Sequence, residues 1–288
     1  MNIQSLATQV ADYLHETDNE LGVANPLPGL WLFEQSKATE HCPMLYEPVV
    51  CLILQGQKEI VLETSVLTIT PGTSLLVSHD LPVISCSTPE STSKPYLAIV
   101  LALDLPLLRS LYEEVSSELG DPGVRAHSIA VEECDPRLID CLSRYLLVAG
   151  DPIETKVMAP LILREIHFRL LRAGHGGMLR ELLRYDSYAS TIARAIARIR
   201  RDFRQRMVVP ELAQDMGMSS SSFHKHFKAI TSVTPLQYQK ELRLFEAKRL
   251  LSACEGSVSE VAFEVGYESP NQFSREFTRK FGVSPRDV

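Results

Sequence analysis

Cysteine is scarce in this sequence, and the cysteines are not spaced as in a disulfide-bonded fold or a structural zinc site. The six cysteines contain no Cys-x-x-Cys pair and lie too far apart for a zinc ribbon or a small disulfide-bonded fold. Most of them are therefore expected to be small buried apolar residues. Three thiols in the N-terminal third remain candidate sensors of an oxidant or electrophile: Cys42, Cys51 and Cys86.

Long apolar runs are also missing. The longest, from Tyr96 to Leu108, is broken by Asp104 and Pro106 and is shorter than the roughly 20 residues that a membrane helix needs. The first residues are polar and acidic, without the basic and apolar segments of a secretory signal. We therefore expect a folded cytoplasmic protein that does not cross a membrane.

Motifs of the common enzyme classes are absent as well. There is no Walker loop, no dinucleotide-binding fingerprint and no Ser/His/Asp arrangement. His41, Glu47 and His79 could supply metal ligands, but the N-terminal part has no His-x-His pair. The sequence thus predicts a binding protein that is not an enzyme and has neither a metal site nor a cofactor.

Charge is divided unevenly along the chain. The net charge is −7, yet residues 190–288 hold 16 Lys and Arg against 11 Asp and Glu, so the acidic excess lies before them. Charge on a separate domain is largely screened beyond about 8 Å at physiological salt, so it need not keep the basic part from phosphate. The division favours two domains, the second suited to nucleic acid.

Residues 30–103 consist of short β-branched runs separated by turn residues. VVCLIL and EIVL predict two strands joined by a turn at QGQK, and VLTI, SLLVS, PVISC and YLAIVLAL predict more. Such a pattern is typical of a β-sandwich or barrel. Residues 107–119, 136–148 and 153–172 have helical apolar spacing instead. The wide apolar face of the last segment predicts either packing on the β-domain or a dimer interface.

An internal repeat at a shift of 49–50 residues dominates the C-terminal part. Each copy has an Ala, a Gly four residues later, a Phe-x-x-x-Phe pair and a closing Val-x-Pro. The matched residues are Ala213, Gly217, Phe223, Phe227, Val233 and Pro235 with Ala262, Gly266, Phe273, Phe277, Val283 and Pro285. A short helix, a glycine turn and a second helix make a helix-turn-helix, so two such units are predicted.

The segments around the repeat support this interpretation. Ser269-Pro270-Asn271-Gln272 predicts an N-capped start for the second helix of copy two. Residues 235–252 predict one uninterrupted helix between the copies. Its length of about 27 Å could set two recognition helices about one DNA turn apart, ~34 Å.

The outward face of each second helix carries side chains that can read base edges. Phe223 and Phe227 fall on one face of the first helix, and the polar residues fall on another. Asn pairs with adenine and Arg or Lys with guanine, whereas flanking cations suit phosphate. The predicted base-reading residues are Ser221, His224, Lys225, Asn271, Ser274 and Arg275, and the predicted phosphate contacts are Lys228, Arg279 and Lys280.

These motifs resemble the AraC/XylS family of bacterial transcription regulators. The Ala-x-x-x-Gly turn, the Phe-x-x-x-Phe helix, the connecting run RLFEAKRLL and the closing GVSP all follow the family pattern, over about residues 190–286. The resemblance implies base contacts at Ser221, His224 and Lys225 in the first unit and at Pro270, Asn271 and Arg275 in the second. Proline has no donor to offer at its position.

Residues 30–105 resemble, more distantly, the cupin-type effector domain of part of that family, chiefly in QGQKEIVL and PGTSLLVSHDLPV. A barrel of this kind implies a ligand pocket at its mouth. The candidate ligand-binding residues are Trp31, His41, Tyr46 and His79.

The predicted architecture is α+β. Residues 1–183 are expected to form a cupin-like β-barrel or sandwich with flanking helices, 184–189 a linker, and 190–288 an all-α domain of two helix-turn-helix units joined by a long helix. The predicted function is a homodimeric, sequence-specific regulator of transcription, by preference an activator. It would bind double-stranded DNA, respond to a small-molecule effector and act on RNA polymerase. The alternatives are a regulator without a ligand, controlled by abundance or a protein partner, and a cupin metalloenzyme with a DNA-binding appendage.

Overall fold

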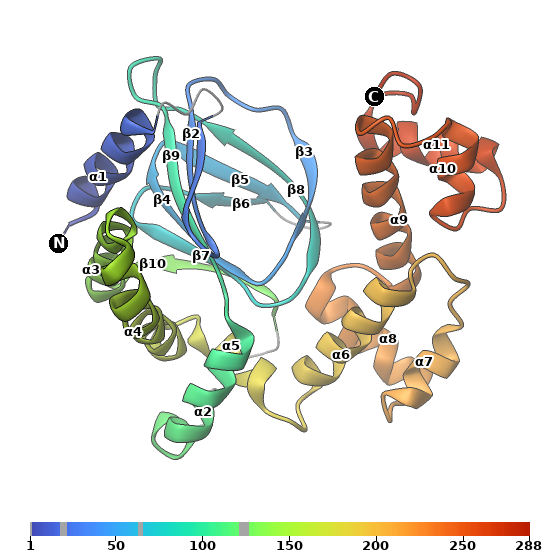
Figure 1. The fold of residues 1–288 in the computed structure, drawn as a ribbon. Helices are drawn as coiled ribbons and strands as arrows, with labels where there is room; N and C mark the ends of the chain where they lie inside the picture. Colours follow the sequence, from blue (N-terminus) through green and yellow to red (C-terminus); the bar gives the residue numbers. More distant parts are fainter. Residues whose placement is uncertain (1, 18–21, 63–65, 121–126) are drawn as a thin grey trace.

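Two antiparallel sheets form the N-terminal half of the computed structural model, which describes residues 2–17, 22–62, 66–120 and 127–288 (Figure 1). The six-stranded sheet has the order β1 (Val23–Leu27), β2 (Leu30–Gln35), β9 (Tyr96–Ala102), β4 (Val49–Gln55), β7 (Thr73–Val77) and β10 (Ile129–Glu133). The four-stranded sheet has the order β3 (Cys42–Tyr46), β8 (Leu81–Thr88), β5 (Gln57–Val61) and β6 (Val66–Ile69). The strands predicted from the apolar runs are confirmed as β4 to β9, and β1, β2, β3 and β10 are additions.

Side-chain alternation explains why the central strands are apolar on both faces. In β4, Cys51 and Ile53 face the second sheet, whereas Leu52 and Leu54 belong to the cluster under the helices. Successive residues of a strand point to opposite faces, so a strand covered on both sides reads as a continuous apolar run. The interior between the sheets is therefore separate from the helical layer outside.

The flanking helices cover the six-stranded sheet on one side (Figure 1). They are α1 (Ile3–Glu16), α2 (Leu105–Leu119), α3 (Pro136–Leu147), a 3₁₀ turn η1 (Val148–Gly150), α4 (Pro152–Arg172) and α5 (Gly176–Leu183). The three helical segments expected from periodicity are confirmed as α2, α3 and α4. Helix α1 is an addition, capped by Asn2 and buried through an apolar stripe, Leu6, Val10 and Leu14.

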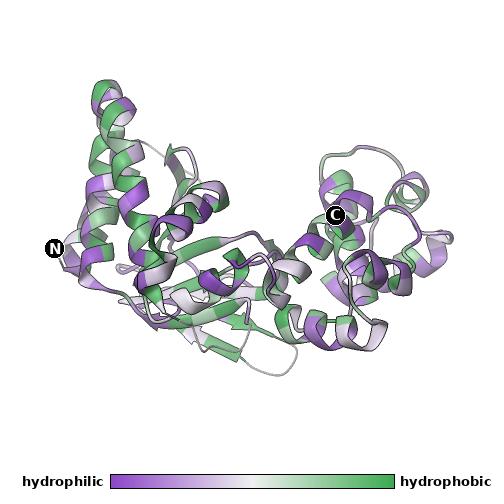
Figure 2. Cartoon of the chain, turned by 90° about the horizontal axis from the view of Figure 1, so that it is seen from below, coloured by the Kyte–Doolittle hydropathy of each residue, from purple (hydrophilic) through white to green (hydrophobic). Residues whose placement is uncertain are grey.

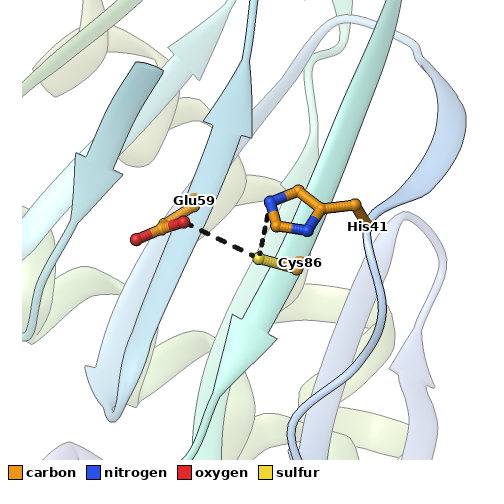
Figure 3. Close-up of side chains that lie close together, drawn as sticks. All are labelled: His41, Glu59 and Cys86. Carbon is orange, nitrogen blue, oxygen red and sulfur yellow. Dashed lines mark hydrogen bonds between the residues drawn. The ribbon is translucent and has the colours of Figure 1, made fainter.

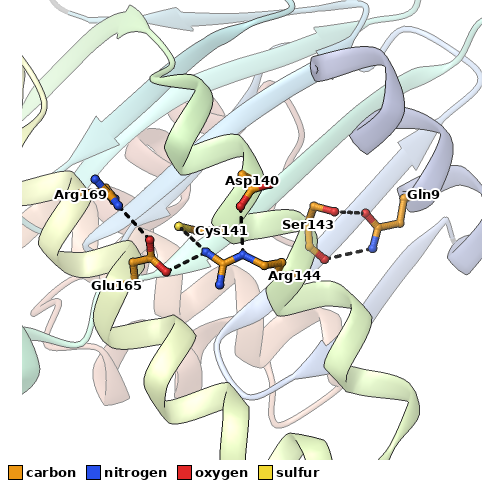
Figure 4. Close-up of polar contacts among 7 residues, drawn as sticks. All are labelled: Gln9, Asp140, Cys141, Ser143, Arg144, Glu165 and Arg169. Carbon is orange, nitrogen blue, oxygen red and sulfur yellow. Dashed lines mark hydrogen bonds and ion pairs between the residues drawn. The ribbon is translucent and has the colours of Figure 1, made fainter. Parts of the chain in front are cut away.

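Polar contacts fix α1, α3 and α4 relative to one another (Figure 4). Arg144 of α3 binds Glu165 of α4 at 2.7 Å, and Arg169 binds the same carboxylate at 3.0 Å. The two guanidinium groups hold the pKa of Glu165 low, at about 2. Ser143 donates to Gln9 Oε1 at 2.6 Å, and the Gln9 amide donates back to the Ser143 carbonyl at 3.1 Å. Helix α1 is thereby pinned to the helical layer.

Helix α4 has one row of apolar residues that is buried in the N-terminal domain and a second row that is exposed to solvent. Ile162, Ile166 and Leu170 are buried in the apolar cluster that the flanking helices share with the six-stranded sheet, and α4 itself packs on α2, α3 and α5. Ile153, Val157 and Leu161 are 76%, 57% and 59% exposed, and we call them the α4 stripe. Figure 2 shows apolar residues along the helices that project from the sheets, at the left of the view.

The C-terminal part is entirely helical in its regular elements. Its helices are α6 (Tyr188–Asp202), α7 (Val209–Asp215), α8 (Ser220–Thr231), α9 (Pro235–Ser252), α10 (Val258–Glu264) and α11 (Pro270–Phe281). Separate apolar clusters lie under α6–α8 and under α10–α11, and α9 contributes to both. The all-α prediction is confirmed, and no described helix is long and apolar enough to cross a membrane.

The junction between the two parts is short. Helix α5 ends at Leu183 and α6 begins at Tyr188, two residues before the expected start of the C-terminal domain at residue 190. Ser187 caps α6 by accepting from the Ser190 amide at 2.9 Å. The Ser190 hydroxyl donates to the Tyr185 carbonyl at 2.9 Å, so the connection is itself hydrogen-bonded.

Candidate DNA-reading surface and effector cavity

The first helix-turn-helix unit is α7, a turn at Gly217 and α8. Gly217 has φ of +71°, a left-handed conformation that costs glycine little. Ser219 caps α8, and Phe223 and Phe227 are fully buried against α6 and Tyr238. Burial of one face leaves the opposite face of α8 to solvent.

The second unit, α10, a turn at Gly266 and α11, repeats this construction. Gly266 has φ of +91°, and a Cβ there would lie 2.1 Å from the Arg204 carbonyl oxygen, so no other residue fits. Ser257 and Glu260 form a capping box on α10, and the carboxylate accepts from the Ser257 amide at 2.8 Å. Phe273 and Phe277 are fully buried.

Most of the predicted reading residues are displayed to solvent. Among the predicted base-reading residues, Ser274 is half-buried and the others are exposed: Ser221, His224, Lys225, Asn271 and Arg275. Lys228 and Arg279 are exposed as well. The two outward faces sit at matching positions of two equal units, as the repeat requires. Base and phosphate contacts by these residues stay predictions, as does the spacing of the units by one turn of DNA.

Lys280 is a correction to the predicted phosphate contacts. Its ammonium forms an ion pair with Glu241 of α9, and both side chains are less than one-fifth exposed. The ammonium also lies 5.5 Å from the centre of the Phe245 ring. Lys280 therefore joins α11 to α9 and is not presented to a DNA backbone.

Pro270 and His226 have roles in the packing and the start of their helices. Pro270 is the first residue of α11, where its missing amide leaves no hydrogen bond unmade. His226 stacks on Tyr188 of α6, with ring centres 3.6 Å apart. Only His224 of the His-x-His pair in α8 points outward, so the two do not form a metal pair.

The helix-turn-helix part is docked on the β-domain through a polar interface. Figure 1 shows α9 beside β3 and β8. Arg200 of α6 binds Asp80 at 2.7 Å and Glu47 at 2.8 Å. Tyr238 of α9 donates to the Asp80 carbonyl at 3.2 Å, and the Ser128 hydroxyl binds the Ile230 carbonyl of α8.

His79 belongs to this interface and does not line the cavity described below, which corrects its predicted role as a ligand-binding residue. It is buried, with Nδ1 2.9 Å from the Ser78 hydroxyl and Nε2 3.1 Å from the Ala189 carbonyl. The carbonyl can only accept, so Nε2 carries the hydrogen and Nδ1 accepts. Burial lowers the pKa of His79 to about 4, against the opposing effect of the bond to Ala189.

A cavity of about 620 Å³ lies between the two sheets. Its size falls within the range usual for small-molecule sites, ~300–1,000 Å³. Trp31, Phe33, Tyr46 and Tyr96 give it an aromatic lining, and Val49, Leu75 and Val100 add aliphatic surface. Of the four predicted ligand residues, Trp31 and Tyr46 line this cavity. Their contact with a ligand stays a prediction.

Lys58 is a cavity residue that the sequence pattern misses. The run QGQK looks like a turn, but Gln57 and Lys58 begin β5, and Lys58 points into the cavity beside Tyr46. The Lys58 ammonium is 5.2 Å from the centre of the Tyr46 ring. Burial lowers the pKa of Lys58, but Cys51 and Tyr46 raise it by more, so the amine is protonated at neutral pH. The alternation of β5 with Ile60, which is buried, could have indicated its direction.

The three candidate sensor thiols all lie at the cavity. Cys42, Cys51 and Cys86 are among its lining residues, and Cys42 is exposed. Burial raises the pKa of the Cys51 and Cys86 thiols, which disfavours the reactive thiolate at both. His41 is outside the lining, with its Nε2 3.6 Å from Cys86 Sγ. A sensing role for these thiols stays a prediction.

Comparison with known proteins agrees with both halves of the fold. Residues 26–178 match the family of AraC-type transcriptional regulator N-termini, and residues 212–288 match a helix-turn-helix domain. The HTH-type transcriptional activator RhaS of Escherichia coli O139:H28 is 34% identical over 43% of this chain and 45% of its own length. RhaS of Citrobacter koseri is 32% identical over 49% of each chain. The chain thus spans about half the length of these curated relatives.

Solved structures extend the similarity of fold to nearly the whole chain. ToxT from Vibrio cholerae strain SCE256, bound to an unsaturated fatty acid, superposes with a TM-score of 0.61 at 12% identity, over 90% of this chain and 92% of that one. ToxT from strain O395, bound to (E)-4-(8-methylnaphthalen-1-yl)but-3-enoic acid, gives 0.59 at 13% identity, over 89% and 96%. An AraC-type N-terminal domain and a duplicated helix-turn-helix on one chain lead to a single assignment: the protein belongs to the AraC family of DNA-binding transcription regulators.

Proposed function

We propose that the protein is a homodimeric, sequence-specific activator of transcription that reads DNA with α8 and α11 and is controlled by a small apolar anion. The observation that carries the DNA-reading part is the duplication itself. Two recognition helices bury a Phe pair each and display polar residues at equivalent positions. The activating direction, through RNA polymerase, is supported by the activator relatives. The cytoplasm is the proposed location.

The proposed domain division follows the apolar clusters. Residues 1–183 hold the sheets, their helices and the cavity, 184–189 connect, and 190–288 hold the two reading units. Ala189 and Leu45 lie outside residues 190–288 but pack against the apolar cluster of the first reading unit. The proposed boundaries therefore separate the functions of the two domains, although side chains make contact across them.

Selection of DNA from a random pool tests the reading surface. Arg275→Ala should weaken binding to the selected DNA site by about 1–3 kcal/mol and should relax the base preference at one or two base pairs. Arg279→Ala should instead weaken all DNA about equally and reduce the dependence of binding on salt. Arg109→Ala, at an exposed residue of α2, is the matched control. If Arg275→Ala and Arg279→Ala both bind like the control, α11 is not the reading helix.

Lys58 indicates the charge of the effector. Among the residues that the structure describes, no carboxylate forms an ion pair with Lys58, although the ammonium is buried beside Tyr46 and Cys51. Glu47 also borders the cavity, but its carboxylate is held by Arg200. A buried charge without an opposite charge beside it is costly, and an anion in the cavity would relieve that cost.

The hydroxyl of Tyr46 supports the same ligand chemistry. It is buried beside the Lys58 ammonium, and the interaction between the two groups raises the pKa of Lys58. One carboxylate could accept from this hydroxyl and from the Lys58 ammonium, while an apolar body fills the remaining space. The ligands of the two ToxT structures are carboxylic acids of this kind. We therefore propose a compact apolar carboxylic acid as the effector.

Calorimetry with paired compounds tests the effector proposal. A panel of aliphatic and aromatic carboxylates is compared with the amides of the same acids, on the native protein and on Lys58→Met. The native protein should bind at least one carboxylate more tightly than its amide, and Lys58→Met should lose that difference. Lys94→Met removes an exposed ammonium that pairs with Glu90 and should change nothing. Equal binding of acids and amides, or no binding at all, contradicts the proposal; the second result favours a regulator without a ligand.

The α4 stripe is the proposed contact between two copies. Ile153, Val157 and Leu161 repeat every four residues, so they form one row along the helix. The same row on a second copy is complementary to it about a two-fold axis, as in antiparallel helix pairs. Leu147, at the end of α3, is a further exposed apolar residue of the helical layer, at 62% exposure. An exposed apolar row of this length is unusual unless a partner covers it.

A further inference from the structure

Three side chains with different metal-binding atoms meet on the four-stranded sheet (Figure 3). Glu59 of β5 stands directly opposite Cys86 of β8 in the strand register. Paired residues of an antiparallel sheet project on the same side, so the carboxylate and the thiol share one face. His41, in the segment before β3, reaches over the same face.

The distances suit one cation. The His41 Nε2 lies 3.6 Å from Cys86 Sγ, and Sγ lies 4.0 Å from Glu59 Oε2. All three ligand atoms lie within 4.8 Å of one another. Around a tetrahedral zinc ion, with bonds of about 2.0–2.3 Å, neighbouring ligand atoms are roughly 3.5 Å apart. Shifts of a few tenths of an ångström to about an ångström would bring the three atoms to that spacing.

We propose that His41, Glu59 and Cys86 bind a divalent cation of the zinc class. Imidazole, carboxylate and thiolate are the donors that zinc takes in proteins, and the mixture disfavours magnesium or calcium, which prefer oxygen alone. Three protein ligands leave the fourth position to water or to a ligand from solution. His41 is exposed, so the ion has a path to the site.

The site would act on the rim of the cavity. The segment that carries His41 also carries Thr39, whose amide donates to the Ser87 carbonyl at 2.9 Å. The Ser87 amide donates in return to the Thr39 hydroxyl at 2.8 Å, and both residues line the cavity. A cation that joins His41 to Cys86 and Glu59 would fasten this segment to β8 and β5. Metal binding would thereby stabilise one wall of the effector cavity.

The groups around Cys86 keep its thiol protonated in the absence of an ion. Burial and the neighbouring Glu59 raise the pKa of the Cys86 thiol, Cys42 acts in the same direction, and Lys58 opposes them. The ion binds the thiolate form of Cys86, so it must displace the thiol proton. Lys58 lies on the opposite face of β5 from Glu59, since the two residues are adjacent in the strand.

Cobalt(II) is the probe for the first test, because a bound thiolate gives it a charge-transfer absorption. The full-length protein, freed of metal with a chelator and kept reduced, is titrated with cobalt(II), and zinc(II) is then added in competition. One equivalent should produce the thiolate absorption, and zinc should abolish it. Cys86→Ser should remove the absorption. His41→Ala and Glu59→Gln should each weaken binding at least tenfold.

Two controls separate the site from general metal binding. Cys254→Ser removes the other exposed cysteine besides Cys42, and His15→Ala removes an exposed histidine of α1; neither should alter the titration. His41 is exposed, so its variant keeps the experiment decisive even if Cys86→Ser folds poorly. An absorption that persists in Cys86→Ser overturns the proposal, as does an unchanged affinity of His41→Ala for cobalt(II) or the absence of stoichiometric binding by the native protein. The titration needs no DNA, so its outcome is independent of the proposed regulatory function.

Discussion

His79 should make the docking of the two domains sensitive to acid. The imidazole is buried between β7 and α6 and is neutral, with a pKa lowered from 6.5 to about 4 by burial. In the unfolded chain it would titrate near its ordinary value. Between these two values the unfolded state takes up a proton that the folded state refuses, so stability present above pH 6.5 is lost as the pH falls toward 4.

The size of the effect follows from the two pKa values. Between pH 7 and pH 5 the free energy of unfolding should fall by about 2 kcal/mol from His79 alone, and by about 3 kcal/mol by pH 4. His167 and His175 also have pKa values lowered by burial, so the total loss should be larger. The contribution of His79 is therefore measured by comparing the pH dependence of the free energy of unfolding in the native protein and in a variant that lacks this histidine.

Urea unfolding at a series of pH values, followed by the fluorescence of Trp31, gives that difference. Trp31 is the single tryptophan and lies in β2, so its signal reports on the β-domain. His79→Gln keeps a donor for the Ala189 carbonyl and removes the titrating group. The variant should lose about 2 kcal/mol less than the native protein between pH 7 and pH 5. Parallel curves for the two proteins would refute the reasoning that His79 is held neutral at the interface.

Further predictions concern packing, assembly and the reading surface. Phe277→Ala, at a fully buried ring 4.6 Å from that of Phe281, should cost about 3–5 kcal/mol, measured by denaturant unfolding; a loss below 1 kcal/mol would contradict the packing of the second unit. Replacing Ile153 and Val157 by Lys should halve the mass in sedimentation equilibrium, and an unchanged mass would place the dimer contact elsewhere. Lys280→Ala should lower the melting temperature, because it leaves a largely buried carboxylate unpaired, at a cost of about 1–3 kcal/mol. The Lys280→Ala variant should keep the salt dependence of DNA binding of the native protein. A weaker salt dependence would show that Lys280 contacts a phosphate after all.

The reading units could be derived from sequence because they depend on local spacing. Phe223 and Phe227 lie four residues apart, which places them on one face of any helix and fixes which residues face outward. The caps before α10 and α11 and the glycines of the turns act within a few residues of chain. Repetition of the pattern excluded coincidence. No knowledge of distant contacts was needed.

Lys58 and Lys280 show where local spacing fails. Lys58 lies two residues after Gly56 in a run of turn-forming residues. Alternation with Ile60 can indicate the direction of its side chain, but only the packing of the two sheets encloses it in a cavity. Lys280 has the position and charge of a phosphate contact, but its partner Glu241 lies 39 residues earlier on α9. Both misassignments have the same origin, because the environment of each ammonium is made by segments that are distant in sequence.

The sequence by itself determined the double helix-turn-helix, its outward faces, the β-rich first half and three of its helices. Periodicity, capping and turn preference are short-range effects, and each leaves a pattern within one element. Only the tertiary structure decided that His79 bridges the domains, that Lys58 enters the cavity, and that His41, Glu59 and Cys86 meet on one sheet. These sites depend on strand register and domain docking, which are set by the burial of apolar surface between segments far apart in the chain.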